Sequence, residues 1–390
     1  MRGAIIRRGK TSWRLKYDLP RDPETDERRI QYKTVRGKRA DAEKELRAIL
    51  SRLDAGMYVE TSQVTLGDFL DNWLATKAPQ SVGPKSLERY CGLVRHQIKP
   101  ALGARLLQHL RPADISNWLD ELVAADNLST RSIRHAHGVL RTALNHAAAI
   151  ELVARNVASI VKPPALVKKE VEILTSDQIG NVLDKLQGLS IFPIAATAIG
   201  TGARRGEIAA LRRSDVDFGT ATLRIERALE QTAAGIRVKQ PKTAAGRRTV
   251  SLPAVTVEAI RTHLVETMET RMALGAGALP DNAYLFSDIE GAPPKPDMIS
   301  DRWRDAVRYR KLPKVTFHAL RHSHASALIA AGMDIVSVSK RLGHASPALT
   351  LSVYGHMFRP DDRDAAVAID AALQKTPRCQ LGANLGVPRI

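Results

Sequence analysis

A proline pair near the middle of the chain limits what this sequence can fold into. Lys162-Pro163-Pro164 is followed closely by Lys168-Lys169. Because proline pairs resist helix and favour extended backbone, this stretch predicts a linker between globular parts. The chain has 390 residues and 44% of them are apolar, enough for two or three domains with ordinary cores.

The net charge of the chain limits the classes of partner that it can bind. A net charge of +18 points to a polyanion, and either nucleic acid or an anionic membrane surface fits that charge. No apolar run reaches about 18 residues, and the first residues lack the apolar core of a signal peptide, so we expect no membrane segment. Cys91 and Cys379 are the only cysteines, which predicts neither a disulfide framework nor a cysteine zinc cluster and suits a reducing cytoplasm.

Residues 1–60 predict a small sheet followed by a helix from Asp41 to Ala55. Thirteen Lys and Arg stand against five Asp and Glu in residues 1–40, and the acids cluster in the loop between the predicted strands. The sheet therefore presents a basic face that either binds DNA or is simply solvated. Two runs alternate in the manner of half-buried strands, with Trp13, Leu15 and Tyr17 on one side of the first and Ile30, Tyr32 and Thr34 on one side of the second. The candidate DNA-binding residues are Arg14, Lys16, Arg29 and Lys33.

Residues 64–162 predict a helical domain. Thr65 is a plausible N-cap for the first helix, and further helices are expected over 86–98, 112–124 and 129–149. The last of these has a predicted buried stripe and a separate basic face, which suits either a phosphate backbone or water. The stripe comprises Ile133, His137, Leu140 and Leu144, and the candidate DNA-binding residues are Arg131, Arg134 and Arg141.

Residues 170–375 predict a mixed, mainly helical domain, and 376–390 a flexible C-terminal tail. Thr175 is expected to begin a helix, and an apolar helix over 191–198 leads to the turn Thr201-Gly202-Ala203-Arg204. Short strands are expected over 222–225, 236–238 and 248–252. The predicted fold class is therefore α+β, mainly helical with small sheets.

A group of arginines, histidines and one late tyrosine suggests phosphodiester chemistry. Arg204 follows the glycine turn, and Arg321 lies three residues after His318, a spacing that puts both side chains on one helix face. Guanidinium groups suit the charge that develops on phosphate oxygens, because their planar fork binds two oxygens and keeps its proton. His344 and Tyr354 follow near the end of the chain, ten residues apart. A tyrosine in this setting can attack a phosphate that the arginines hold.

These motifs, in this order, resemble the tyrosine recombinases, the phage-type integrases. The motifs are Thr-Gly-x-Arg-x-x-Glu over 201–207, His-x-x-Arg over 318–321, Leu-Gly-His over 342–344 and the tyrosine at 354. Gln240-Pro241-Lys242-Thr243 stands where the family has a lysine hairpin. The resemblance covers the whole chain. It implies an arm-type DNA-binding domain with a three-stranded sheet over 1–60, a helical, SAM-like core-binding domain over 64–162 and a catalytic domain over 170–375.

The resemblance implies that Tyr354 is the nucleophile and forms a 3′-phosphotyrosine link. The phenol has an ordinary pKa of about 10 and needs help to lose its proton, for which His318 is the nearest candidate by analogy. Arg204 and Arg321 would grip the scissile phosphate, and His344 would hydrogen-bond it.

The resemblance also implies supporting roles. Lys242 would protonate the leaving 5′-oxygen, with Lys239 as a rival, and Glu207 would orient the arginine and histidine. His322 and His324 are read as structural or DNA-facing, with a direct catalytic part as the lesser alternative. The ester keeps the bond energy, so neither a nucleotide cofactor nor a metal is implied. The expected partners are double-stranded DNA with attachment-type sites, three further copies in a tetramer on DNA, and DNA-bending and directionality factors. The expected location is the cytoplasm, in association with the nucleoid.

Three other functions fit part of the pattern. His318 and His322 have a metal-compatible spacing, but the residues between them lack the acid of a His-Glu-x-x-His zinc hydrolase. A DNA-binding architectural or regulatory protein would need the basic faces but not Tyr354. A type IB topoisomerase would share the nucleophile, although the basic arm favours recombination between specific sites.

Overall fold

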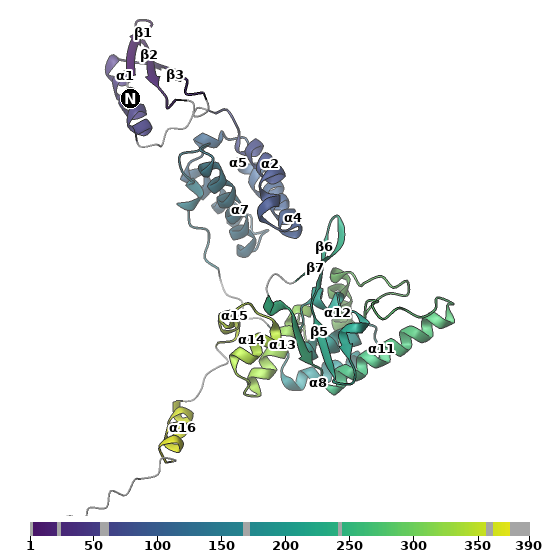
Figure 1. Ribbon diagram of the computed structural model, residues 1–390. Helices are drawn as coiled ribbons and strands as arrows, with labels where there is room; N and C mark the ends of the chain where they lie inside the picture. Colours follow the sequence, from purple (N-terminus) through teal and green to yellow (C-terminus); the bar gives the residue numbers. More distant parts are fainter. Residues whose placement is uncertain are drawn as a thin grey trace, which may run out of the picture. The chain divides into compact units, whose positions relative to one another are not determined.

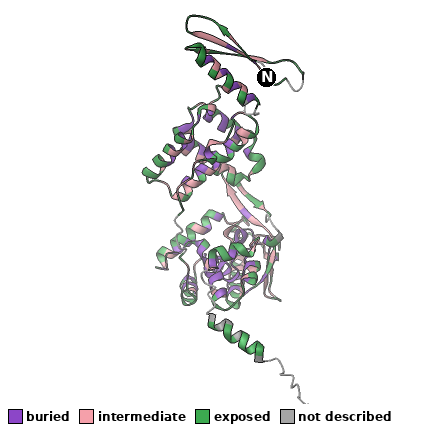
Figure 2. Ribbon diagram, turned by 90° about the vertical axis from the view of Figure 1, so that its left-hand side faces the viewer, coloured by how far each residue is buried: buried purple, intermediate pink, exposed green. Residues whose placement is uncertain are grey.

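The computed structural model describes residues 3–21, 25–54, 62–166, 172–240, 244–355 and 362–374. The chain divides into two compact units, Met1–Lys168 and Lys169–Ile390 (Figure 1). In both, the buried residues lie on the inward sides of the helices and strands (Figure 2). No helix of the described residues has the length and apolar character needed to cross a membrane.

The first unit begins with a three-stranded antiparallel sheet and a helix. The strands β1 (Gly3–Arg7), β2 (Ser12–Asp18) and β3 (Ile30–Arg36) pair in the order β1-β2-β3, and α1 (Arg39–Asp54) follows. The side chains of Leu15 and Tyr17 are buried against the apolar face of α1, which includes Leu46 and Ile49. The sheet and helix expected for this segment are therefore present, and the two predicted strands form with a third.

The sequence pattern predicts the wrong side of β3 as the buried one. Tyr32 pairs with Lys16, and Thr34 pairs with Arg14, so both lie on the sheet face opposite Leu15. Tyr32 is 53% exposed, and the central carbon of the Arg14 guanidinium lies 5.6 Å from the centroid of its ring. Alternation fixes which residues share a face, but only packing against α1 decides which face is buried.

The remainder of the first unit is helical. Its longest helix, α7, buries all four residues of the predicted stripe, and its first residue follows the N-cap Ser129. Thr65 caps α2 by accepting a hydrogen bond from the amide of Asp68 at 3.1 Å. The elements are α2 (Leu66–Thr76), α3 (Ala78–Ser81), α4 (Pro84–Leu93), the π-helical turn Val94–Ile98, α5 (Lys99–Leu102), the 3₁₀ turn Leu107–His109, α6 (Pro112–Ala124), α7 (Thr130–Ala149) and the 3₁₀ turn Val157–Ser159.

The second unit combines small sheets with helices around one large core. The strands β4 (Val216–Asp217), β5 (Thr222–Ile225) and β8 (Arg248–Ser251) form an antiparallel sheet, and β6 (Ala228–Thr232) and β7 (Gly235–Lys239) form a hairpin. The helices are α8 (Ser176–Leu186), α9 (Phe192–Thr201), α10 (Arg205–Ala209), α11 (Ala254–Ala273), α12 (Pro296–Tyr309), α13 (Phe317–Ala330), α14 (Ile335–Leu342), α15 (Pro347–Tyr354) and α16 (Asp362–Gln374), with 3₁₀ turns at Arg213–Asp215 and Ala244–Gly246.

Helices α9 and α13 position the chemistry of this unit. Both pack into the interior, and a small apolar cluster joins α13 to α14 and α15. Tyr354 belongs to that cluster together with Ile329, Val338 and Leu342. The aromatic side chain at the end of α15 is thus anchored by packing, and only 4% of the residue is exposed. The predicted tail, residues 376–390, lies outside the described residues.

Candidate active site

A glycine turn between α9 and α10 positions the first arginine. Gly202 ends α9 in the left-handed conformation with φ +64°. A Cβ atom at this residue would stand 2.6 Å from the ring of His324 and 2.8 Å from Leu342, so the chain can pass only as glycine. The turn makes Arg204 the N-cap residue of α10.

Glu207 is a buried carboxylate between two arginines. It accepts hydrogen bonds from the Arg204 side chain at 2.8 Å, from the Arg204 backbone amide at 2.9 Å and from the Arg248 side chain at 2.9 Å. Burial opposes its ionisation, but the charges of Arg248 and Arg204 outweigh burial and lower the pKa of Glu207. The sequence predicts the supporting role of Glu207 and misses Arg248 as its second partner.

Three arginines meet at the C-terminal end of α14. Arg321 donates to the carbonyls of Gly202 at 2.6 Å and Leu342 at 2.8 Å. Arg204 donates to the carbonyl of Gly343 at 3.3 Å, and Arg248 to that of Arg341 at 2.8 Å. These carbonyls include the unpaired acceptors of a helix end, which carries partial negative charge. The helix end therefore holds the cations together.

Arg321 and Arg204 differ in exposure. Arg321 is 4% exposed, and burial, followed by the nearby charge of Arg204, lowers its pKa. The side chain of Arg204 is 42% exposed. The group therefore offers one accessible guanidinium beside a buried one, an arrangement suited to an anion approaching from outside.

His344 lies beside the same group of cations. Its Nδ1 is 2.7 Å from the hydroxyl of the fully buried Thr350. Burial, and then Arg321 and Arg204, lower the pKa of His344 to about 4. The ring is therefore neutral at neutral pH, and the contact with Thr350 leaves its Nε2 for another partner.

The hydroxyl of Tyr354 is hydrogen-bonded to His322. The Nδ1 atom of His322 and the hydroxyl oxygen are 2.6 Å apart. The sequence predicts His318 in this place, one helical turn earlier on α13, but the ring of His318 contacts the ring of His322 edge-on at a centroid distance of 5.0 Å. The spacing of four residues in His318-x-x-x-His322 signals that both rings share a face. Only the packing of α15 shows which one the tyrosine contacts.

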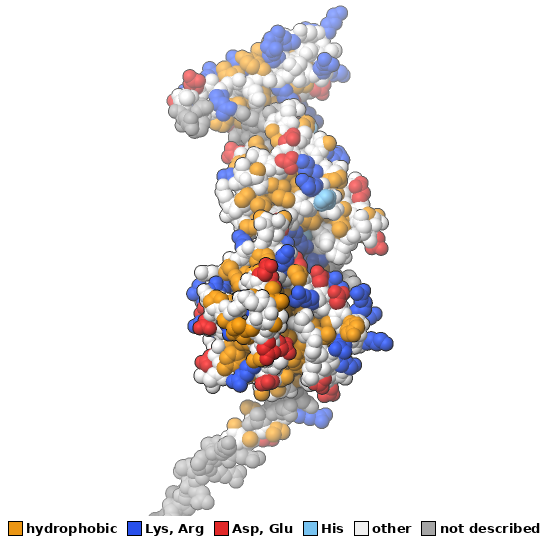
Figure 3. Space-filling view, turned by 90° about the vertical axis from the view of Figure 1, so that its right-hand side faces the viewer, with side chains coloured by type: hydrophobic (Ala, Val, Ile, Leu, Met, Phe, Trp, Pro, Cys, Tyr) orange, Lys and Arg blue, Asp and Glu red, His pale blue; other side chains and the backbone are white. Residues whose placement is uncertain are grey.

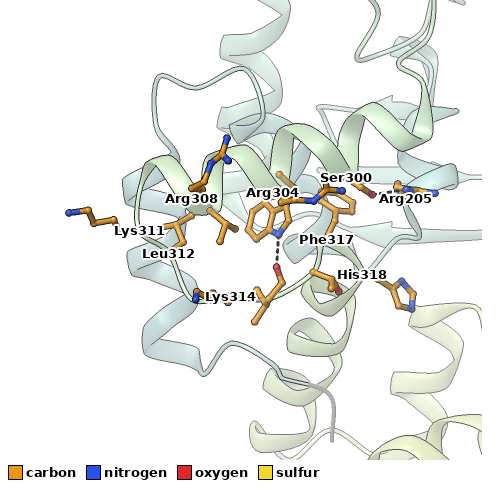
Figure 4. Close-up of a pocket in the computed structure, with 13 residues that line it drawn as sticks. Arg205, Ser300, Arg304, Arg308, Lys311, Leu312, Lys314, Phe317 and His318 are labelled. Atoms are coloured by element: carbon orange, nitrogen blue, oxygen red, sulfur yellow. Dashed lines mark hydrogen bonds between the residues drawn. The ribbon is translucent and has the colours of Figure 1, made fainter. Parts of the chain in front are cut away.

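His318 borders a pocket of about 960 Å³ beside α12. Burial, and then His322 and Arg321, lower the pKa of His318 to about 4. Figure 4 shows His318 and Lys311 at opposite ends of the pocket. The apolar residues of the lining include Trp303, Val307, Leu312, Val315 and Phe317. The basic residues of the lining are Arg205, Arg304, Arg308, Lys311 and Lys314.

Lys242 lies outside the described residues, as do its neighbours Pro241 and Thr243. Its rival Lys239 ends β7, and its ammonium group donates to Glu230 at 2.8 Å. Lys239 is therefore engaged on the hairpin. His324, also considered from the sequence, is buried, with its Nδ1 2.6 Å from the carbonyl oxygen of Ile199 and its Nε2 3.1 Å from Arg341, so it is structural.

The candidate DNA-binding residues of the first unit have different surroundings. Arg131 and Arg141 are exposed on α7, whereas Arg134 donates to the carbonyl of Pro164 at 2.8 Å. On the sheet, Arg14 and Lys16 share the face opposite α1, and Arg29 is exposed just before β3. Lys33 lies on the helix side and pairs with Glu45 at 2.6 Å. Figure 3 shows Lys and Arg side chains in several groups on the surface of the first unit.

Within the described ranges, no three His, Cys, Asp or Glu residues are grouped as metal ligands. His318 and His322 are near one another, but the Nδ1 of His322 already contacts Tyr354.

Comparison with known proteins identifies the family. A family model described as the phage integrase family matches residues 172–359, and one for the phage integrase N-terminal SAM-like domain matches residues 65–123. Together they cover more than half of the chain. A tyrosine recombinase XerC-like protein of Caldanaerobacter subterraneus is 26% identical over 93% of this chain and 96% of its own length. An integrase of Streptomyces ambofaciens is 28% identical over 87% of this chain and 88% of its own length.

Solved structures share the fold. The integrase of transposon Tn1549, in complex with a circular intermediate DNA, has a TM-score of 0.64 and 21% identity over 80% of this chain and 99% of its own. A lambda integrase dimer bound to a core site has a TM-score of 0.57 and 16% identity over 92% of this chain and 96% of its own. The chain belongs to the phage integrase family of tyrosine recombinases, enzymes that cut and rejoin DNA at specific sites.

Proposed function

We propose that this protein integrates and excises a phage or other integrative element by recombining attachment-type sites in double-stranded DNA. The observation that carries the proposal is the Tyr354 hydroxyl, anchored by packing and hydrogen-bonded in a unit that also gathers Arg204, Arg321 and Arg248 at one helix end. The relatives named integrases, including that of Mycobacterium phage L5, support the biological role.

Tyr354 is the nucleophile of this reaction. Its hydroxyl oxygen attacks the scissile phosphorus and the bond to the 5′-oxygen breaks, leaving a 3′-phosphotyrosine ester and a free 5′-hydroxyl. The leaving oxygen takes its proton from Lys242, which follows β7 in the sequence. Rejoining reverses these steps with a 5′-hydroxyl of another strand, and the energy kept in the ester makes a nucleotide unnecessary.

The phosphate is held by fixed positive charge. Arg204 offers its exposed guanidinium to the non-bridging oxygens, while Arg321 supplies charge from the interior. His344 is neutral and hydrogen-bonded to Thr350, so it can donate from Nε2 without adding charge. His318 lines the pocket beside α12 and serves to hold an adjacent phosphate oxygen. Glu207 keeps Arg204 in place.

The remaining cations bind the duplex around the scissile phosphate. Residues 1–60 serve as the arm-type domain, 64–162 as the core-binding domain and 170–375 as the catalytic domain. Arg131 and Arg141 of α7 are exposed and suit phosphate contacts, as do Arg304 and Arg308 of α12, with side chains 74% and 85% exposed. A lambda integrase tetramer on a Holliday junction has a TM-score of 0.55, which supports assembly of four copies on DNA.

Trapping the covalent ester tests this function. The substrate is a duplex that carries the direct repeat bounding the element in which the gene lies. A nick in this duplex lets the cleaved strand diffuse away. We expect a denaturant-resistant adduct with the wild type and none with Tyr354→Phe. Tyr309→Phe is the matched control, because Tyr309 is 74% exposed at the end of α12 and its substitution should leave the adduct unchanged. Equal adduct from wild type and Tyr354→Phe, or none from either, refutes the proposal.

A further inference from the structure

The residue that contacts the Tyr354 hydroxyl belongs to none of the family motifs. His322 lies one turn after His318 on α13, and its Nδ1 is 2.6 Å from the phenolic oxygen. The two rings have a centroid distance of 5.7 Å and are tilted by 52°. In this geometry the hydrogen bond, rather than ring stacking, is the closest interaction of the two side chains.

The buried phenol needs a proton acceptor. Burial raises the pKa of Tyr354 to about 12, although the charge of Arg321 acts in the opposite direction. At neutral pH a phenol of that pKa is ionised in only about one molecule in 10⁵. An attacking hydroxyl of this kind gains from a base already in hydrogen-bond contact.

His322 has the protonation state that a base requires. Burial and the charge of Arg321 lower its pKa, so the ring is neutral at neutral pH. A neutral imidazole that carries its proton on Nε2 presents a lone pair on Nδ1, the atom that faces Tyr354. The charged and titratable groups around it are Arg321, His318, His344 and Tyr354.

We propose that His322 is the general base of the cleavage step, accepting the Tyr354 proton on Nδ1. As the phenolic oxygen bonds to phosphorus, its hydrogen moves to His322, which becomes an imidazolium while the 5′-oxygen leaves with a proton from Lys242. In rejoining, the 5′-hydroxyl bonds to phosphorus and gives its proton to Lys242, while the phenolate leaves phosphorus and takes its proton back from His322. This inference rests on the proposed function, since it assigns the partner of that nucleophile.

The positive charge that forms on His322 stands beside Arg321, which opposes it. The bound phosphate, which gains negative charge in the transition state, offsets that repulsion. Proton transfer to His322 is therefore favourable only when DNA occupies the site, and the tyrosine stays protonated without it.

A nucleophile of lower pKa separates base catalysis from mere positioning. In His322→Asn the amide oxygen replaces Nδ1 as a hydrogen-bond acceptor but cannot take the proton. We expect its cleavage rate on the nicked substrate to fall about 10²-fold with natural tyrosine. A trifluorotyrosine at position 354 has a phenol that ionises near neutral pH. When both proteins carry this residue, the cleavage rate of His322→Asn should recover most of its deficit relative to the wild type.

His318→Asn is the matched control, one turn away on the same helix. Trifluorotyrosine should not restore its activity if His318 only holds the phosphate. A 5′-bridging phosphorothiolate substrate, whose thiolate leaves without a proton, should rescue Lys242→Ala but not His322→Asn. If the His322→Asn variant does not bind DNA in a gel shift, His322→Gln replaces it in the same comparison.

Three results overturn the assignment of His322: a loss below about threefold on substitution, a loss that trifluorotyrosine leaves unchanged, or rescue of His318→Asn in its place. Failure of the proposed function is a different result, in which the wild type itself forms no adduct at Tyr354.

Discussion

At the scale of single residues, Glu207 is the residue on which the arrangement of the cations depends. Its carboxylate is 7% exposed and accepts from Arg204 and Arg248, and the Arg248 side chain is 6% exposed. Since an uncompensated buried charge is costly, each of these groups is stable only because the others are present. Glu207 thus limits the repulsion among arginines that approach one helix end.

Replacing Glu207 with glutamine should destabilise the second unit by about 3 kcal/mol at neutral pH, because Arg248 loses its buried counter-charge. The pKa of Glu207 lies below the ordinary 4.5, so its contribution is fully present above that value and is lost as pH falls through the lower folded-state value. Urea unfolding of both proteins, followed by circular dichroism from pH 7 to pH 3, should show two stabilities that differ at neutral pH and converge in acid.

Asp305→Asn is the control for this measurement. Its partner Arg308 lies 3.4 Å away with 85% of the side chain exposed, so the pair is solvated and should contribute little. A stability difference for Glu207→Gln that stays constant into acid would show that the carboxylate charge is not what stabilises the unit.

The residues of the site differ in how far the sequence reveals them. Arg204, His318, Arg321, His344 and Tyr354 stand in motifs whose residue types suit phosphate chemistry. The partnerships of Arg248 with Glu207 and of His322 with Tyr354 join elements 41 and 32 residues apart in the chain. No local periodicity encodes such contacts, because they arise when α13, α15 and β8 pack around the end of α14.

At the scale of elements, the turn between α9 and α10 connects the core to the site. The carbonyl of Gly202 accepts from Arg321, and its Cα faces His324 and Leu342. The turn therefore fixes the buried arginine from one side while α14 fixes it from the other.

Gly202→Ala should be more damaging than an alanine at another left-handed glycine. The positive φ costs about 1 kcal/mol for any residue with a Cβ, and the overlap with His324 and Leu342 adds about 1–3 kcal/mol. Gly188→Ala is the control, since φ is +76° there and no atom lies within 4 Å of the added Cβ. Urea midpoints should rank wild type, Gly188→Ala and Gly202→Ala in falling order. Equal midpoints for the two variants would show that the site relaxes around the methyl group.

The elements themselves were predictable where a local signal was strong. The helix over Pro112–Ala124 begins at a proline and ends where expected, and Ser129 caps α7 as a side-chain acceptor. Strand β6 was not predicted, because Ala228-Leu229-Glu230-Gln231-Thr232 has neither alternation nor β-branched enrichment. It forms through pairing with β7, a contact that the residues of β6 alone do not indicate.

At the scale of the whole molecule, the basic charge is spread over segments with separate cores. The apolar clusters of the sheet domain, the helical domain and the second unit share no residue. Each segment presents its own cations: Arg14 and Lys16 on the sheet, Arg131 and Arg141 on α7, and Arg304 and Arg308 on α12. Affinity for a duplex should therefore be a sum of several small electrostatic contributions rather than the property of one patch.

Removing two exposed arginines from α7 should change how DNA affinity responds to salt. Each phosphate contact releases about one counterion, so Arg131→Ala combined with Arg141→Ala should reduce the slope of log affinity against log salt by about 2. Lys33→Ala is the control, because its ammonium group already pairs with Glu45 at 2.6 Å on the helix side of the sheet, and its slope should stay near that of the wild type. Fluorescence anisotropy with a labelled duplex over a series of KCl concentrations measures all three slopes. Parallel lines for the wild type and the double variant would mean that α7 does not contact the phosphate backbone, and the DNA contacts proposed for residues 64–162 would then have to come from other faces of this segment.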